Sequence, residues 1–151
     1  MTRFFLTLQE AISLLFKAAE VSIGGETFVE KMNAFRLVDL AKAIIEEFGD
    51  KNTKIIEIGT RPGEKIDEVL VSRYEVENTY QFDEIYYIIL PFNYIEGLKE
   101  HYSKLNLKKV DFEEYSSKDY LNSVKEFKDL LKKGLINKEE ARFRAANKDN
   151  F

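Results

Sequence analysis

A short charged stretch, Ile-Gly-Thr-Arg-Pro-Gly-Glu-Lys at residues 58–65, restricts most strongly how this chain can fold. Pro62 fixes its own φ and disfavours a helical conformation at Arg61, whereas Gly63 can adopt a positive φ. The stretch therefore predicts a tight turn. Residues 54–58 before it are rich in β-branched side chains, which predicts a strand. Residues 66–71 after it carry apolar side chains at the spacing of a short helix.

The predicted turn gathers one guanidinium, one carboxylate and one ammonium group at the end of a strand. Arg61 suits bidentate contact with a phosphate, Lys65 adds a second positive charge, and Glu64 can accept hydrogen bonds from a pair of sugar hydroxyls. The same residues also fit an ordinary strand-to-helix turn whose charges are solvated, and the residues alone favour this plainer interpretation.

Composition narrows the class of protein. The 151 residues predict one compact domain spanning 1–151, and 44% hydrophobic with 33% charged residues indicate a soluble globular protein. A net charge of −4 without a basic stripe argues against nucleic-acid binding. The absence of cysteine excludes disulfides and favours a cytoplasmic location. We expect neither a signal peptide nor a membrane-spanning segment.

Hydrophobic periodicity predicts an α/β fold of the α+β type, in which helices pack on a small sheet. The expected strands are residues 2–6, 27–30, 54–58 and 84–90. The expected helices are one that begins after a capping box at Thr7 and Glu10, one over 36–48 that ends at Gly49, one that runs from a capping box at Ser123 and Glu126 to Gly134, and a last short one from Asn137.

Catalytic motifs are missing from this sequence. It contains no GxGxxG fingerprint, no phosphate-binding loop and no Tyr-x-x-x-Lys pair. His101, the only histidine, is predicted to be a solvated surface residue. No metal-ligand cluster stands out. We therefore expect no catalytic residue and no metal site, and we expect most of the tyrosines at 86, 87, 94, 102, 115 and 120 to serve in packing.

Several segments taken together resemble one protein family. They are residues 1–11, 25–31, 38–41, 58–65 and 71–72, in that order and spacing. The set resembles the carboxy-terminal half of the CapD-like UDP-sugar epimerases and 4,6-dehydratases of capsular polysaccharide biosynthesis, which are extended short-chain dehydrogenases/reductases. The match covers roughly 1–91 and continues more weakly at 115–117 and in the helix running to Gly134.

The resemblance implies a division of labour. In the family, an amino-terminal Rossmann domain binds NAD(P) and carries the Tyr-x-x-x-Lys pair, whereas the carboxy-terminal part holds the UDP portion of a UDP-N-acetylhexosamine. On this pattern Arg3 and Arg61 grip the pyrophosphate, and Glu64 lies near the ribose or sugar hydroxyls. Thr2 and Thr60 offer further hydroxyl hydrogen bonds.

Two positions depart from the family pattern. Asn33 stands where the family often has proline, and Asp67 where it often has tyrosine or histidine. Because a carboxylate repels phosphates, Asp67 is expected to weaken anion binding.

The expected function follows from the resemblance. We expect a weak UDP-sugar-binding part of such an epimerase or dehydratase, with NAD(P) confined to a separate Rossmann-domain partner and no turnover by this chain alone. An alternative is a non-catalytic, self-associating or protein-interaction module, and a third is a fragment that keeps the fold without activity. We also expect a homo-oligomer, because apolar helix faces that a second domain covers in the family are exposed without it.

Overall fold

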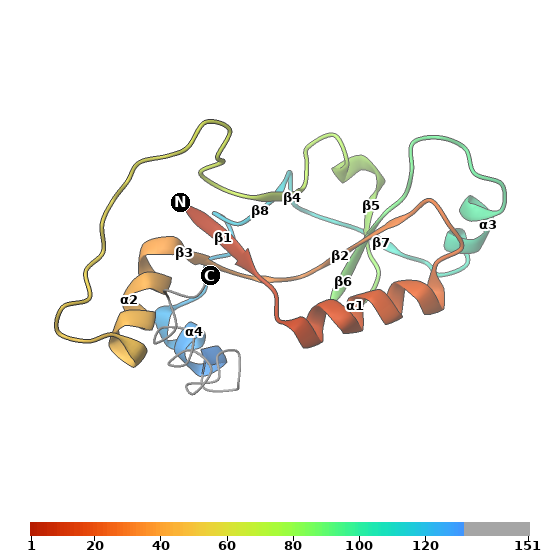
Figure 1. The fold of residues 1–151 in the computed structure, drawn as a ribbon. Coiled ribbons are helices and arrows are strands. Elements are labelled where there is room, and N and C mark those ends of the chain that lie inside the picture. Colours follow the sequence, from red (N-terminus) through yellow and green to blue (C-terminus); the bar gives the residue numbers. More distant parts are fainter. Residues whose placement is uncertain (132–151) are drawn as a thin grey trace, which may run out of the picture.

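The computed structural model describes residues 1–131 and shows a mixed α/β arrangement (Figure 1). Its helices are α1 (Leu8–Val21), α2 (Leu37–Phe48), α3 (Leu98–Ser103) and α4 (Val124–Leu130), with one 3₁₀ turn at Val76–Asn78. Its strands are β1 (Thr2–Phe5), β2 (Thr27–Glu30), β3 (Asn33–Arg36), β4 (Val69–Val71), β5 (Thr79–Gln81), β6 (Tyr86–Ile89), β7 (Lys108–Lys109) and β8 (Tyr115–Ser116).

The strands form small antiparallel sheets, which confirms the predicted fold class. β1 pairs with β3, β4 pairs with β8, and a larger sheet has the order β2-β6-β5-β7. In Figure 1, α1 runs beside the larger sheet, while α2 and α4 lie together at the other end of the molecule. Within residues 1–131, no helix has the length and apolar character needed to cross a membrane.

Both predicted capping boxes are present. The Thr7 hydroxyl accepts the Glu10 N–H at 3.1 Å while the Glu10 carboxylate accepts the Thr7 N–H at 2.8 Å, and Ser123 and Glu126 repeat the pattern before α4. Helix α2 ends at Gly49 as predicted, although Gly49 has a φ of −75° and uses no left-handed conformation. The predicted stop at Gly134 and the helix from Asn137 lie outside the described residues.

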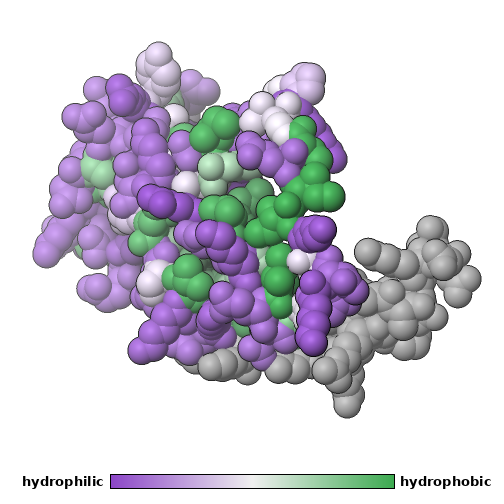
Figure 2. Space-filling view, turned by 90° about the vertical axis from the view of Figure 1, so that its left-hand side faces the viewer, coloured by the Kyte–Doolittle hydropathy of each residue, from purple (hydrophilic) through white to green (hydrophobic). Residues whose placement is uncertain are grey.

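Two predicted elements beside the charged stretch are wrong. Residues 54–58 form no strand, and Ile56 and Ile58 are 79% and 78% exposed. Residues 66–71 form no helix, because Val69–Val71 pairs with β8 as strand β4. A segment of high strand propensity, such as residues 54–58, forms a β-ladder only where a neighbouring strand is available to pair with it. At residues 66–71, pairing with β8 overrides a weak helical pattern. Residues 51–68 form a loop, and Figure 2 views the molecule from the side on which this loop lies. Apolar side chains appear there among the polar surface.

Aromatic packing links β1 and β3 to the helices at one end of the molecule. Phe127 of α4 is 2% exposed and contacts Phe35 of β3 and Phe5 of β1, with ring centroids 5.2 and 5.5 Å apart. Ala43 of α2 is fully buried in the same cluster. These contacts hold α2 and α4 against the strand that carries Thr2 and Arg3.

The tyrosines follow the packing prediction for the most part. Tyr86, Tyr102 and Tyr115 are buried, whereas Tyr94 is 78% exposed. Burial raises the pKa of Tyr115, whose hydroxyl accepts the Met32 N–H at 2.8 Å. His101 is half-buried with its ring edge-to-face against Tyr102, so it is less solvated than predicted.

The aromatic cluster makes a testable prediction about stability. Phe127→Ala should lower the free energy of unfolding by about 3–5 kcal/mol, because it leaves a cavity between β1, β3 and α2. Urea denaturation measures this loss. Phe92→Ala is the matched control, since Phe92 is 66% exposed, and it should change the stability by less than about 0.5 kcal/mol. Equal losses in the two variants would contradict the assignment of the core.

Candidate functional site

A buried polar cluster joins three segments that are far apart in the sequence. Thr2, at the start of β1, is 7% exposed, and its hydroxyl donates to the Asp67 carboxylate at 2.6 Å. The Thr2 oxygen also lies 2.6 Å from the hydroxyl of the fully buried Ser117. Because Thr2 has already donated its one hydroxyl proton, Ser117 donates to Thr2. Ser117 in turn accepts the Glu68 N–H at 2.9 Å, so these hydroxyls fix residues 67–68 against β1.

Arg3, the next residue, extends this attachment toward the charged stretch. Its guanidinium donates to the carbonyls of Thr2, Ile66 and Lys65 at 2.6, 3.2 and 2.9 Å. It also lies 3.9 Å from the Glu64 carboxylate and 3.6 Å from that of Glu68. Arg3 therefore binds the backbone of the segment that follows the turn, and a neighbouring carboxylate balances its charge.

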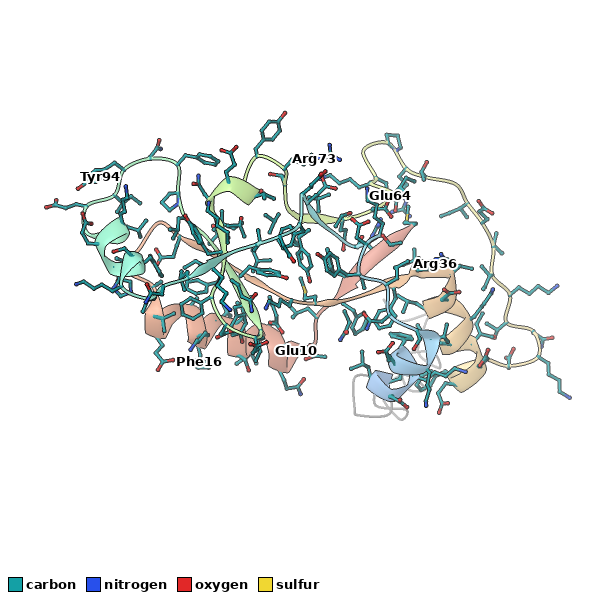
Figure 3. The ribbon with its side chains drawn as sticks, turned by 180° about the vertical axis from the view of Figure 1, so that it is seen from behind. Glu10, Phe16, Arg36, Glu64, Arg73 and Tyr94 are labelled. Atoms are coloured by element: carbon teal, nitrogen blue, oxygen red, sulfur yellow. The ribbon has the colours of Figure 1, made fainter. Side chains whose placement is uncertain are left out.

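The predicted tight turn is present at residues 61–64. Gly63 has a φ of +81°, the left-handed conformation that glycine adopts at little cost. The Glu64 N–H donates to the Arg61 carbonyl at 3.0 Å, and the Glu64 carboxylate accepts the Arg61 N–H at 3.0 Å. Glu64 therefore contacts both the Arg3 side chain and the Arg61 backbone. Figure 3 shows Glu64 beside the amino-terminal end of β1.

The remaining predicted site residues, Thr60 and Arg61, lie on the surface of this turn and are exposed. Lys65, which the sequence offers as a further cation, is also exposed. Within residues 1–131, no hydrogen bond or ion pair holds the side chains of Arg61 and Lys65. The structure thus brings Thr2, Arg3 and Glu64 into one connected site, with two unpaired cations at its outer side.

Sequence reasoning missed three residues of this site. Asp67 was noted only as a departure from the family, yet it accepts the Thr2 hydroxyl. Glu68 binds the Phe4 N–H at 2.9 Å, and Ser117 lies more than 100 residues from Thr2 in the chain. Their partners come from distant segments, so spacing within one segment gives no signal for them. Among residues 1–131, no group of three histidine, cysteine or acidic side chains is arranged to hold a metal ion.

Comparison with known proteins identifies the family. A family model described as "Polysaccharide biosynthesis protein" matches residues 1–90, which include β1, the turn and the Asp67–Glu68 segment. The chain belongs to this family. This finding confirms the resemblance to the CapD-like epimerases and dehydratases.

Individual relatives agree with the family assignment. The capsular polysaccharide biosynthesis protein CapD of Staphylococcus aureus is 38% identical over 107 residues, 69% of this chain and 16% of CapD. A UDP-glucose 4-epimerase of Rickettsia akari is 38% identical over 126 residues, 76% of this chain and 37% of the epimerase. The X-ray structure of Pen from Bacillus thuringiensis superposes with a TM-score of 0.71 at 33% identity, over 87% of this chain and 37% of Pen. The chain therefore spans well under half the length of these proteins.

The buried cluster predicts a contrast between two threonines. Thr2→Val keeps the side-chain shape but leaves Asp67 and Ser117 without their partner, so it should lower the free energy of unfolding by about 1–3 kcal/mol. Thr60→Val is the matched control at an exposed position and should leave stability within about 0.5 kcal/mol of the wild type. Urea denaturation of both variants decides the point. A neutral Thr2→Val would show that the cluster does not anchor the turn.

Proposed function

We propose that this chain is the UDP-N-acetylhexosamine-binding part of a polysaccharide-biosynthesis epimerase or 4,6-dehydratase. One observation carries the proposal: Arg3 and Glu64 hold an exposed turn that presents Arg61 and Lys65 without an ion-pair partner among residues 1–131. Family membership supports it, because the matched region contains this turn.

The contacts assign different tasks to the residues of the proposed site. Arg61 and Lys65 have unpaired cationic side chains, so they are the groups that bind the diphosphate. The N–H groups of the Arg3 guanidinium donate to backbone carbonyls, so Arg3 positions the turn. Its positive charge adds to that of the proposed site from the side of β1. The Glu64 carboxylate oxygens contact Arg3 and the Arg61 N–H. In this position they accept hydrogen bonds from sugar or ribose hydroxyls.

Cofactor chemistry belongs to another part of the enzyme in this proposal. The sequence contains neither the glycine-rich dinucleotide fingerprint nor the Tyr-x-x-x-Lys pair, so its residues do not fit NAD(P). A Rossmann-domain polypeptide supplies the cofactor, in the cytoplasm where nucleotide sugars are made.

Incubation of this chain alone with UDP-N-acetylglucosamine and NAD(P) should give no conversion.

Titration of UDP-N-acetylglucosamine followed by NMR tests the binding proposal. The turn is open to water, so we expect a Kd of about 1 mM or weaker that rises with salt because of screening. Arg61→Ala should weaken binding roughly tenfold to a hundredfold, since a charge-assisted hydrogen bond contributes about 1.5–3 kcal/mol. Arg3→Ala should weaken binding to a similar degree and also destabilise the fold, because it releases residues 65 and 66.

A matched variant controls for loss of positive charge. Lys99→Ala removes a cation from α3, which lies at the opposite end of the molecule from the turn in Figure 1, and it should leave the Kd unchanged. If Lys99→Ala and Arg61→Ala weaken binding equally, the loss of affinity comes from the change in net charge and not from a contact of Arg61 with the ligand. No saturable shift at the turn in the wild type would refute the binding proposal.

A second candidate function is a self-associating or protein-interaction module, and the surface of α1 favours it. Helix α1 has no buried residue, and four apolar side chains at helical spacing lie on its outer face. We call this set the α1 stripe: Leu8, Ile12, Leu15 and Phe16, with exposed fractions of 72%, 43%, 70% and 73%. Monomeric proteins rarely leave such a stripe open, so it indicates a contact surface.

Light scattering tests self-association through the α1 stripe. We expect an average mass above that of one 151-residue chain at micromolar concentration. Leu15→Glu should shift the mass toward the monomer, because it places a charge in the apolar contact. Ile58→Glu is the matched control, since Ile58 is equally exposed but lies in the loop before the turn. A monomer mass for the wild type, or an equal effect of both variants, would contradict this function.

A further inference from the structure

A pocket lies away from the charged turn, between the start of α1 and the β2–β6 pair. Its volume is about 420 Å³, and it is lined by Gln9, Glu10, Ser13, Glu30, Lys31, Glu84, Ile85 and Tyr86. Figure 3 shows Glu10 and Phe16 on α1, where the pocket and the α1 stripe share the same helix. None of the pocket residues belongs to the site at residues 60–68.

Glu30 is the unusual residue of this pocket. Glu30 is only 7% exposed, and its Oε2 atom has no hydrogen-bond partner within residues 1–131. An ionised carboxylate oxygen in that position has lost its water without gaining a donor, which is unfavourable. Burial, and then the nearby Glu10 carboxylate, raise the pKa of Glu30. The Glu30 carboxylate therefore lacks a positive partner.

The neighbouring charges do not supply that partner. Glu10 and Glu84 add negative charge to the lining. Lys31 also lines the pocket, but its ammonium group donates to the Asp83 carbonyl at 2.9 Å and lies 4.8 Å from the Tyr87 ring centroid. One Glu10 oxygen accepts the Thr7 N–H of the helix cap. The pocket thus presents negative charge that residues 1–131 leave unbalanced.

The shape and lining of the pocket indicate an organic cation. Divalent cations need several oxygen ligands around one point, and residues 1–131 contain no such group. An alkyl chain ending in a cation fits better, because Ile85 is 52% exposed beside Tyr86 and can contact a methylene stem. The buried Tyr86 ring completes the wall next to Glu30, its partner in the β2–β6 register.

We propose that this pocket binds the cationic end of an alkylammonium or alkylguanidinium group, of the kind that a lysine or arginine side chain of a partner protein presents. The α1 stripe supplies the argument for a protein, because Gln9 and Ser13 in the pocket are sequence neighbours of Leu8 and Ile12 on the stripe. A partner that covers the apolar stripe brings its basic side chain to Glu30. This inference does not depend on UDP-sugar binding.

NMR titration with n-butylammonium and methylguanidinium tests the pocket. Both probes should cause saturable shifts at Glu30 and Tyr86, whereas Mg²⁺ and Na⁺ at matched ionic strength should not. Glu30→Gln should weaken the binding at least about tenfold, since it removes the charged partner. Glu20→Gln is the matched control on an exposed site of α1 and should bind as the wild type. An equal response of Glu30→Gln, or saturation by Mg²⁺, overturns the proposal.

Stability gives a second readout that does not depend on a partner. Because the pKa of Glu30 is raised in the folded state, Glu30 lowers stability as pH rises through that folded pKa, and the penalty is absent below the unfolded pKa. Glu30→Gln should therefore resist urea better than the wild type at about pH 7 and equally at about pH 3. Saturating butylammonium should remove the difference at the higher pH. A wild type that is as stable as Glu30→Gln without probe overturns the proposal.

Two further probes separate a protein side chain from a free polyamine. The peptide acetyl-Leu-Lys-Leu-amide should bind more tightly than butylammonium, because its leucines reach the α1 stripe. Ile12→Ser should remove that gain and leave butylammonium binding unchanged. Spermidine should bind no more tightly than butylammonium. A peptide without advantage, or markedly tighter spermidine binding, would overturn the assignment to a protein partner.

Discussion

The hydroxyl of Thr2 is the point on which the site depends, because it joins β1, the segment at 67–68 and the residues after β8. Thr2, Asp67 and Ser117 satisfy one another away from water, so the loss of any one leaves the others unpaired. Residues 51–68, before β4, contain no helix or strand. The polar cluster therefore holds this segment in place, as the hydrogen bonds of regular secondary structure do elsewhere. A long exposed loop is therefore held to the domain at one end by a few polar contacts.

This attachment determines which charges remain for a ligand. Arg3 donates to the carbonyls of Lys65 and Ile66, just after the turn, and lies beside two carboxylates, so its charge is largely committed inside the chain. Arg61 begins the turn and Lys65 comes directly after it, and both are exposed. The residues that hold the turn and the exposed cations that we propose bind the diphosphate are thus separate sets. In the proposed function, that separation lets the turn keep its place while Arg61 and Lys65 bind the diphosphate.

The surfaces that this chain leaves open fit its relation to much longer proteins. Its matches to CapD, the epimerase and Pen each cover well under half of those proteins. Among residues 1–131, the α1 stripe is exposed and the Oε2 atom of Glu30 has no hydrogen-bond partner. In the proposal above, a single partner protein covers the apolar stripe and brings a basic side chain to Glu30.

The sequence by itself determined the elements whose signals are local. The capping boxes at Thr7 and Ser123, the amphipathic helices α1 and α2, strand β6 and the turn at Gly63 each follow from residues within a few positions of one another, and the ordered motifs identified the family. Only the tertiary structure decided whether the strand-like run at 54–58 has a neighbour to pair with, and that residues 69–71 join β8. It also decided that Thr2 is buried against Ser117 and that Arg3 binds the backbone just after the turn. These outcomes depend on contacts between distant segments, which local propensity and spacing do not encode.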